Sequence, residues 1–315
     1  MAGNSVRNLK GFLDLINAVD NVHQDYDFGK LYKLFLPHDT RPHGFMLPET
    51  VSKIPWSSDF VIDHKSRTVQ LLDRSNGEDT SKASIAAFQN TVDVAIDADI
   101  FPMLHNDHSE MYKIVGADYF VCLERFSAPL FGVATRGAHM TAYVRSPAGL
   151  KIWVPRRSAQ LFVYPSKLDS TVAGGVKAEH SPLDCIIAEA DEEASLPADF
   201  VREHALPTGI VTYVTKDLEK GIIRPSILYI FDIELPKTMI PEPQDDEVSE
   251  FNLWSVEEVK HAMLRQEFKP NSALVLIDFL IRHGIITEEN EYDYVEIATR
   301  LKRRLPVPTM PKHRK

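Results

Sequence analysis

The chain has 315 residues, 44% of them hydrophobic, so it can bury a substantial core, and its length favours two domains over one. Acidic residues outnumber basic residues 45 to 35, which argues against a general nucleic-acid-binding surface and against adsorption to anionic membranes. The sequence contains no apolar run long enough to span a bilayer and no signal-peptide core, so we expect a cytoplasmic protein. Cys122 and Cys185 lack metal-ligand spacing, which predicts two buried thiols in a reducing compartment.

The first 130 residues predict short helices and strands. Apolar positions at helical spacing predict a helix over residues 8–20, and prolines at 37, 42, 48 and 55 then favour turns. Further along, we expect strands within 66–73 and 114–124 and a helix over 81–90. Pro129 and Gly132 punctuate a change of character, which sets the domain boundary near 128–134. Residues 1–130 are therefore predicted to form an accessory α+β domain, and residues 131–305 the main domain.

The second half alternates strands and helices, as expected of an α/β fold. Strands are predicted over 140–144 and 150–155 around a turn at 146–149, and again over 209–214 and 226–235. An acidic, proline-rich loop follows at 241–246. Ser255 and Glu258 have the capping-box spacing, which predicts a helix over 255–263, and a second helix over 273–283 should end at Gly284.

One helix combines strong boundary signals with an apolar stripe. Ser181 is a favourable N-cap and Pro182 suits the first helical position, so the helix should begin there and end near Ala194. At about 100° per residue, one face of this helix is apolar. The residues that form it are Leu183, Ile186, Ile187, Ala190 and Ala194.

Three glutamates flank that stripe. Glu189, Glu192 and Glu193 are spaced i, i+3 and i+4, so their side chains are neighbours on the helix. No Lys or Arg falls between Lys177 and Arg202 to relieve their repulsion. Clustered carboxylates suit a hard cation such as Mg²⁺ or Mn²⁺. The alternative is a solvated acidic helix face.

A glycine pair precedes the helix. Gly174 and Gly175 suit a backbone that must turn sharply or approach a ligand closely. Together with the helix, the set resembles the Nudix box, Gly-x5-Glu-x7-Arg-Glu-x2-Glu-Glu-x-Gly. Gly174 matches the first glycine, and Glu189, Glu192 and Glu193 match the metal-binding glutamates. The resemblance implies a Nudix α/β/α sandwich and assigns one to three divalent metal ions to these glutamates.

The resemblance extends over most of residues 130–300. This region is similar to the Nudix hydrolases of fungi and plants related to thiamine pyrophosphokinase, which carry an extra N-terminal domain. The similar segments are 137–140, 152–158, 164–169, 245–248, 268–271 and 276–284. The implied substrates are thiamine diphosphate and its oxidised analogues, with release of phosphate.

The chain also departs from the box at three positions. His180 stands in place of the first glutamate, Ala188 in place of the arginine that orients a metal-binding glutamate, and Ser195 in place of the last glycine. Before the box, Leu161, Phe162 and Val163 stand where polar residues are expected in the relatives. These changes affect substrate and efficiency more than fold.

Further residues are candidates for the substrate site. Arg156 and Arg157 offer guanidinium forks for a diphosphate, or form a surface pair at a strand end. Lys167 lies near the glycine pair in sequence, and Glu247 could supply a metal ligand or general base or be one acid in an acidic loop. His180 could contact a phosphate or simply be exposed.

The sequence therefore predicts a metal-dependent hydrolase of a small organic diphosphate. One alternative is a diphosphatase for a prenyl-type substrate, which Phe162 and its neighbours would favour if they line the pocket instead of facing the core of a strand. The other is a catalytically impaired diphosphate-binding protein, which Ala188 and His180 would explain. The oligomeric state, monomer or homodimer, is left open.

Overall fold

A six-stranded mixed sheet forms the centre of the molecule in the computed structural model, which describes residues 11–105, 107–147 and 149–312. Its order is β10-β11-β7-β8-β12, with β9 paired to β7. The strands are β7 (Thr135–Ser146), β8 (Gly149–Arg157), β9 (Val172–Gly175), β10 (Leu206–Lys216), β11 (Ile223–Glu234) and β12 (Val248–Ser255). Strand β7 pairs with β9 through 137–140 and with β8 through 143–146, so it changes partner along its length.

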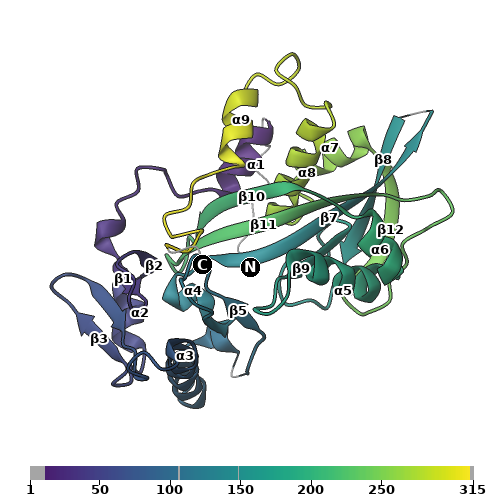
Figure 1. Cartoon of the computed structure of the whole chain (residues 1–315). Helices are drawn as coiled ribbons and strands as arrows, with labels where there is room; N and C mark the ends of the chain where they lie inside the picture. Colours follow the sequence, from purple (N-terminus) through teal and green to yellow (C-terminus); the bar gives the residue numbers. More distant parts are fainter. Residues whose placement is uncertain (1–10, 106, 148, 313–315) are drawn as a thin grey trace.

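Helices cover both faces of this sheet, which confirms the predicted α/β/α sandwich (Figure 1). On one face lie α5 (Pro182–Ala194) and α6 (Ala198–His204). On the other lie α1 (Phe12–Val19), α7 (Val256–Leu264), α8 (Pro270–Arg282) and α9 (Tyr294–Arg300). Among the described residues, no helix is long and apolar enough to cross a membrane.

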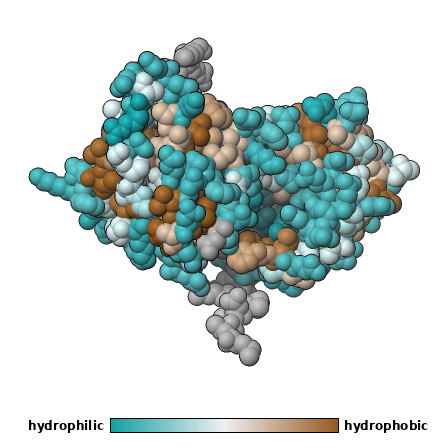
Figure 2. Space-filling model, turned by 90° about the horizontal axis from the view of Figure 1, so that it is seen from below, coloured by the Kyte–Doolittle hydropathy of each residue, from teal (hydrophilic) through white to brown (hydrophobic). Residues whose placement is uncertain are grey.

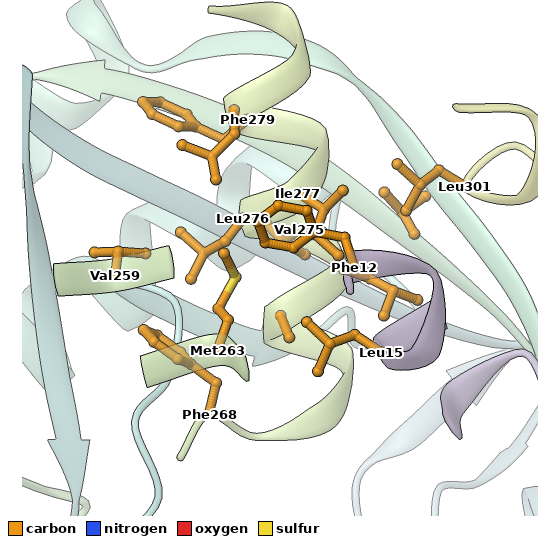
Figure 3. Close-up of a cluster of buried hydrophobic side chains, with 14 of the residues drawn as sticks. Phe12, Leu15, Val259, Met263, Phe268, Val275, Leu276, Ile277, Phe279 and Leu301 are labelled. Atoms are coloured by element: carbon orange, nitrogen blue, oxygen red, sulfur yellow. The ribbon is translucent and has the colours of Figure 1, made fainter. Parts of the chain in front are cut away.

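Helix α8 is the centre of the second face. Figure 3 shows its apolar side chains, including Val275 and Leu276, close to Phe12 and Leu15 of α1. After α1, the buried Asp20 accepts bonds from Arg300 (2.8 Å) and Arg303 (2.7 Å) near the other end of the chain. Helix α1 therefore packs with the sandwich, although it belongs to the residues predicted to form the accessory domain.

The rest of the N-terminal region has its own sheet and core. The sheet has the order β2-β1-β4-β3, and β5 and β6 form a separate hairpin. The strands are β1 (Tyr32–Phe35), β2 (Pro42–Met46), β3 (Phe60–Asp63), β4 (Thr68–Leu71), β5 (Met111–Lys113) and β6 (Cys122–Glu124). The helices are α2 (Pro48–Lys53), α3 (Thr80–Asp97) and α4 (Ala128–Phe131), with short 3₁₀ turns at Phe28–Lys30 and Pro102–Leu104. This part has the predicted α+β character, while the boundary at 130 remains a prediction.

Most predicted elements are present, with different lengths. The helix expected over 81–90 extends to Asp97, and only the end of the strand expected over 114–124 forms, as β6. The helices predicted over 255–263 and 273–283 match α7 and α8. Of the helix predicted from residue 8, residues 8–10 lie outside the described residues, as does residue 148 in the turn before β8.

The expectation that Leu161, Phe162 and Val163 form a strand with core-facing residues is wrong. Residues 158–167 form a loop between β8 and β9, and the exposed fractions of Phe162 and Val163 are 83% and 53%. At the end of strand β8, Arg156 and Arg157 donate hydrogen bonds to carbonyls of this loop. Phe162 and Val163 are exposed at the surface, and Leu161 is half-buried.

Candidate functional site

Helix α5 begins and ends where its sequence directs. The Ser181 hydroxyl accepts a bond from the Asp184 backbone N–H (3.1 Å), and the Asp184 carboxylate accepts one from the Ser181 N–H (3.2 Å), closing a capping box. Pro182 occupies the first turn, as predicted. At the other end Ser195 adopts φ 53°, a left-handed conformation that glycine adopts more easily. Ser195, at the position of the last box glycine, thus has the left-handed backbone conformation although it is not a glycine.

Gly174 is required by the side chain of Glu189. A Cβ atom at Gly174 would lie 2.0 Å from Glu189 Oε1, so the carboxylate lies directly over the bare backbone of β9. The backbone there does not need a positive φ, so the reason for glycine is the close approach. Strand β9 and helix α5 therefore contact each other at Glu189, which matches the first metal-binding glutamate of the box.

Glu193 lies one turn further along, buried beneath Glu189. Its exposed fraction is 7%, and its Oε2 accepts a bond from the Ala173 N–H (3.1 Å). Burial, followed by the charge of Glu189, raises the pKa of Glu193 well above its usual range. Burial and the charges of Glu192 and Glu247 raise the pKa of Glu189 to about 7. These carboxylates are crowded without a counter-charge, and a divalent cation would relieve that.

Glu192 and Glu247 are exposed at the rim of the same site. Glu247 precedes β12, and its charge acts on the pKa of both Glu189 and Glu193, so the predicted loop carboxylate does lie beside the helix. The donor set is entirely oxygen, which fits Mg²⁺ or Mn²⁺. No three of these four side chains bring their oxygens within 4.8 Å of one another among the described residues. The carboxylates would therefore close further around a bound cation.

The three predicted substrate cations hold the loop at 158–167. Arg156 donates to Glu250 (2.9 Å) and to the Ser166 carbonyl (3.1 Å). Lys167 donates to the Gln266 carbonyl (2.6 Å). Arg157 donates to the carbonyls of residues 163 and 164 and to Asp169. Their part in diphosphate binding remains a prediction, and each would have to leave or share these bonds.

Asp169 is a buried hub that the list of candidates missed. Arg157 and Lys269 each approach its carboxylate at 3.1 Å, and the Ser272 hydroxyl donates to it. Burial opposes ionisation, but the charges of Lys269, His139 and Arg157 and the bond from Ser272 together outweigh it, and the pKa of Asp169 falls to about 2. Both Asp169 and Lys269 belong to segments that carried the family resemblance, which was the available signal.

His180 and Phe162 are both exposed. His180 is exposed in the loop before α5, where its backbone N–H donates to the Lys177 carbonyl (3.1 Å). Phe162 contacts the ring of His105 from the N-terminal region, with ring centroids 4.9 Å apart. Figure 2 shows the underside of the molecule as mainly hydrophilic, with separate hydrophobic groups and a hollow near its middle. Both residues are accessible to a ligand.

Two further residues come from a part of the chain where sequence gave no signal. The Tyr112 hydroxyl fills the space over Gly175, where a Cβ atom would lie 1.8 Å from it. Arg125 packs beside Tyr112, with its guanidinium carbon 6.0 Å from the ring centroid, and its charge acts on the pKa of Glu189. Only the fold brings the β5–β6 hairpin to the glycine pair.

A second group of possible ligands lies in the N-terminal region. Atoms of Asp93, His108 and Glu124 lie within 4.8 Å of one another. Gln89 donates to both carboxylates (2.7 and 2.6 Å), and His108 Nδ1 lies 2.7 Å from Glu124 Oε1. Every member thus has a partner within the protein, and the group explains how the loop before β5 is attached to α3. Cys122 and Cys185 are free and buried, as predicted.

A helix bearing crowded carboxylates, set against a glycine pair on an α/β/α sandwich, defines the class of metal-assisted phosphohydrolases. Residues 135–276 match the NUDIX domain. The chain is 33% identical to the uncharacterized protein YJR142W of Saccharomyces cerevisiae, over 95% of this chain and 92% of that protein. The chain belongs to the Nudix family, and its class of enzyme is the Nudix pyrophosphohydrolases.

The chain is also similar to two plant proteins and to solved structures. Nudix hydrolase 20 and Nudix hydrolase 24 of Arabidopsis thaliana, both chloroplastic, are 33% and 32% identical over 69% and 64% of this chain. The chain spans only 58% and 55% of those proteins. Similar structures include a C. elegans Ap4A hydrolase (13% identity, TM-score 0.34, 47% of this chain and 98% of that one). Another is the Nudix hydrolase RenU from M. smegmatis (16% identity, TM-score 0.36, 48% and 87%).

Proposed function

We propose that this protein hydrolyses the diphosphate of a small organic pyrophosphate, with thiamine diphosphate or an oxidised analogue as substrate and phosphate as a product. The observation that carries the proposal is the set of four carboxylates around Gly174. Glu189, Glu192, Glu193 and Glu247 come from one helix and one loop and act on one another's charge. Such a set has little structural value without a cation to bind.

The buried and the exposed glutamates would have different roles. Glu193, fixed by the Ala173 N–H, and Glu189, lying across Gly174, would provide the ordered ligands for Mg²⁺ or Mn²⁺. The exposed Glu192 would complete that set, and Glu247 would accept a proton from the attacking water. A bound divalent ion supplies neutralisation of diphosphate oxygens and activation of water. Gly174 and Gly175 leave the backbone open to the phosphates.

Thiamine compounds are proposed on the family resemblance across residues 130–300. The second candidate, a prenyl-type diphosphate, is favoured by the loop at 158–167, where Phe162 is 83% exposed. Burying such side chains against a lipid-like tail contributes roughly 25 cal/mol per Å² of apolar area. A catalytically impaired diphosphate-binding protein is the third candidate, based on Ala188 and His180.

One substrate panel separates these candidates. We would measure kcat/KM for thiamine diphosphate, oxythiamine diphosphate and a prenyl diphosphate under the same Mg²⁺ concentration. The proposal expects the thiamine compounds to be preferred, and preference for the prenyl compound would overturn the substrate assignment. Binding of all three without phosphate release, in Mg²⁺ and in Mn²⁺, would overturn the hydrolase assignment in favour of a binding protein.

A further inference from the structure

The β5–β6 hairpin of the N-terminal region is fastened to the glycine pair of the Nudix domain. The Ala178 backbone N–H donates to the Met111 carbonyl (2.7 Å), just beyond Gly175. Tyr112, whose exposed fraction is 7%, places its hydroxyl over the Cα of Gly175. Figure 1 shows the hairpin next to β9. The two regions therefore meet at the wall of the candidate active site.

Arg125 follows this hairpin and is held in place by three neighbours. Its guanidinium donates to Glu110 (2.6 Å) and lies 6.0 Å from the ring centroids of both Tyr112 and Phe126. Half of its side chain nevertheless remains exposed. An arginine that is fixed by aromatic rings and still open to solvent can bind an anion at a small cost in side-chain entropy.

Arg125 is linked to the carboxylate site through the two neighbouring glycines. Its guanidinium carbon lies 6.0 Å from the Tyr112 ring centroid, the Tyr112 hydroxyl covers Gly175, and the Glu189 carboxylate covers Gly174. Burial raises the pKa of Glu189, and the charges of Arg125 and the exposed Lys177 oppose that rise. Because Gly174 and Gly175 are adjacent, the contacts place Arg125 beside the carboxylates, where it can share a ligand with them.

Helix α5 itself brings no lysine or arginine to the site. It has Ala188 where the box has arginine, and no Lys or Arg falls between Lys177 and Arg202. Arg156, Arg157 and Lys167 are held by the loop at 158–167. A diphosphate at the glutamates adds negative charge to a site that is already rich in carboxylates, and a guanidinium fork is suited to phosphoryl oxygens.

We propose that Arg125 is a substrate-binding residue that donates hydrogen bonds to the diphosphate, so that the N-terminal region completes the active site of the Nudix domain. This inference rests on the proposed function, because it assumes a diphosphate beside Glu189. It assigns the accessory region a direct part in substrate binding. Helix α5 has Ala188 in place of the box arginine, and Arg125 then supplies a cation from the N-terminal region.

The test compares two matched arginine variants in the full-length protein. Arg145 also lies over a tyrosine ring (5.4 Å), pairs with a glutamate (3.2 Å) and is about as exposed, but it lies at the far end of β7. Arg125→Ala should raise KM for the diphosphate substrate by about 10- to 100-fold, the effect of a lost charged hydrogen bond. Arg145→Ala should leave KM unchanged. Equal KM values for wild type and Arg125→Ala would overturn the inference.

Chemical rescue separates binding from a structural role. Added guanidinium ion at low concentration should lower the KM of Arg125→Ala, and Arg125→Lys should retain an intermediate KM. A raised KM that neither guanidinium nor lysine improves, together with a lowered melting temperature, would mean that Arg125 only stabilises the hairpin and would overturn the inference.

A binding measurement keeps the inference separate from the proposed hydrolysis. If wild type releases no phosphate from any diphosphate, titration calorimetry with inorganic pyrophosphate and Mg²⁺ decides. Pyrophosphate binding that weakens at least 10-fold in Arg125→Ala would support the role of Arg125 although the hydrolase assignment had failed. Equal affinity in the two proteins, or no binding to wild type, would overturn the inference.

Discussion

At the scale of single residues, the proposed metal site consists of carboxylates that need a counter-charge. Mg²⁺ or Mn²⁺ should raise the melting temperature of the wild type by about 2–6 °C at saturation, since a ligand of the folded state stabilises it. Glu192→Gln should remove that rise and lower kcat by about 10²-fold or more while the fold stays intact. Asp191→Asn, an exposed acid on the same helix, is the control and should behave as wild type. Normal turnover by Glu192→Gln would show that the metal site is elsewhere.

The box position at Ala188 gives a second prediction. Ala188→Arg restores the family's arginine, but Arg125 already brings a cation to Glu189. We therefore expect kcat/KM to stay level or fall in this variant. A rise of about tenfold or more, with an unchanged melting temperature, would mean instead that the site is an ordinary Nudix box weakened by the missing ion pair.

The sequence predicted the metal-binding glutamates of this site better than the contacts of its basic side chains. Glu189, Glu192 and Glu193 follow from helical spacing, and Gly174 from the box, because those relations are local along the chain. The buried hub at Asp169 depends on Lys269, a hundred residues away. A contact between such distant residues leaves no spacing pattern in the sequence. Arg157 was therefore predicted to bind the substrate, although its side chain also pairs with the buried Asp169.

At the scale of elements, Asp169 connects the end of the loop at 158–167 to helix α8. Asp169→Asn leaves the partly buried Arg157 and Lys269 without their shared counter-charge, so we expect a loss of about 3 kcal/mol in the free energy of unfolding near neutral pH. Urea unfolding measures this loss. Glu250→Gln removes the half-exposed ion pair to Arg156 and should cost less than about 1 kcal/mol. Similar losses in both variants would contradict the role of Asp169 as a hub.

The same residue predicts a dependence on pH. The pKa of Asp169 is lowered from 3.8 to about 2 in the folded protein. Its contribution to stability, about 2 kcal/mol, is complete above pH 3.8 and is lost as the pH falls toward 2. Urea titrations at several pH values should therefore give a steeper loss of stability in acid for wild type than for Asp169→Asn. Parallel curves would contradict the assigned pKa.

Element boundaries were predictable where capping residues fix them. Ser181 and Ser255 begin α5 and α7 as expected, since each closes a capping box with the third residue of its helix. The loop at 158–167 was not predictable, because Leu161 to Val163 have the composition of a strand. Arg156 and Arg157 anchor this loop through its backbone carbonyls, and such bonds leave no pattern of apolar spacing in the sequence.

At the scale of the whole molecule, the N-terminal region and the Nudix domain share the site through Gly175. Gly175→Ala places a methyl group against the Tyr112 hydroxyl, so the hairpin must move. We expect KM to rise as in Arg125→Ala, because Arg125 moves with the hairpin. Adding Tyr112→Phe removes the hydroxyl and should recover part of the loss. A normal KM in Gly175→Ala would show that the hairpin does not form part of the site.

The organisation of the whole chain was the least predictable level. Division into an accessory region and a Nudix domain follows from the change of composition near residue 131. Helix α1 packs against α8, and Arg300 and Arg303 form ion pairs with Asp20. These contacts join the two ends of the chain. Such contacts leave no local pattern, because the residues that they join are far apart in the sequence.

The most direct test of the central claim is phosphate release from an organic diphosphate as a function of added Mg²⁺, for wild type and Glu193→Gln at equal folded concentration. Glu193 is the buried carboxylate that the Ala173 N–H fixes in the site. We expect wild type to release phosphate only with the divalent ion and Glu193→Gln, still folded, to release almost none at any Mg²⁺ concentration. Release by wild type without divalent ions, or an unchanged rate in Glu193→Gln, would contradict the proposed metal-dependent hydrolysis.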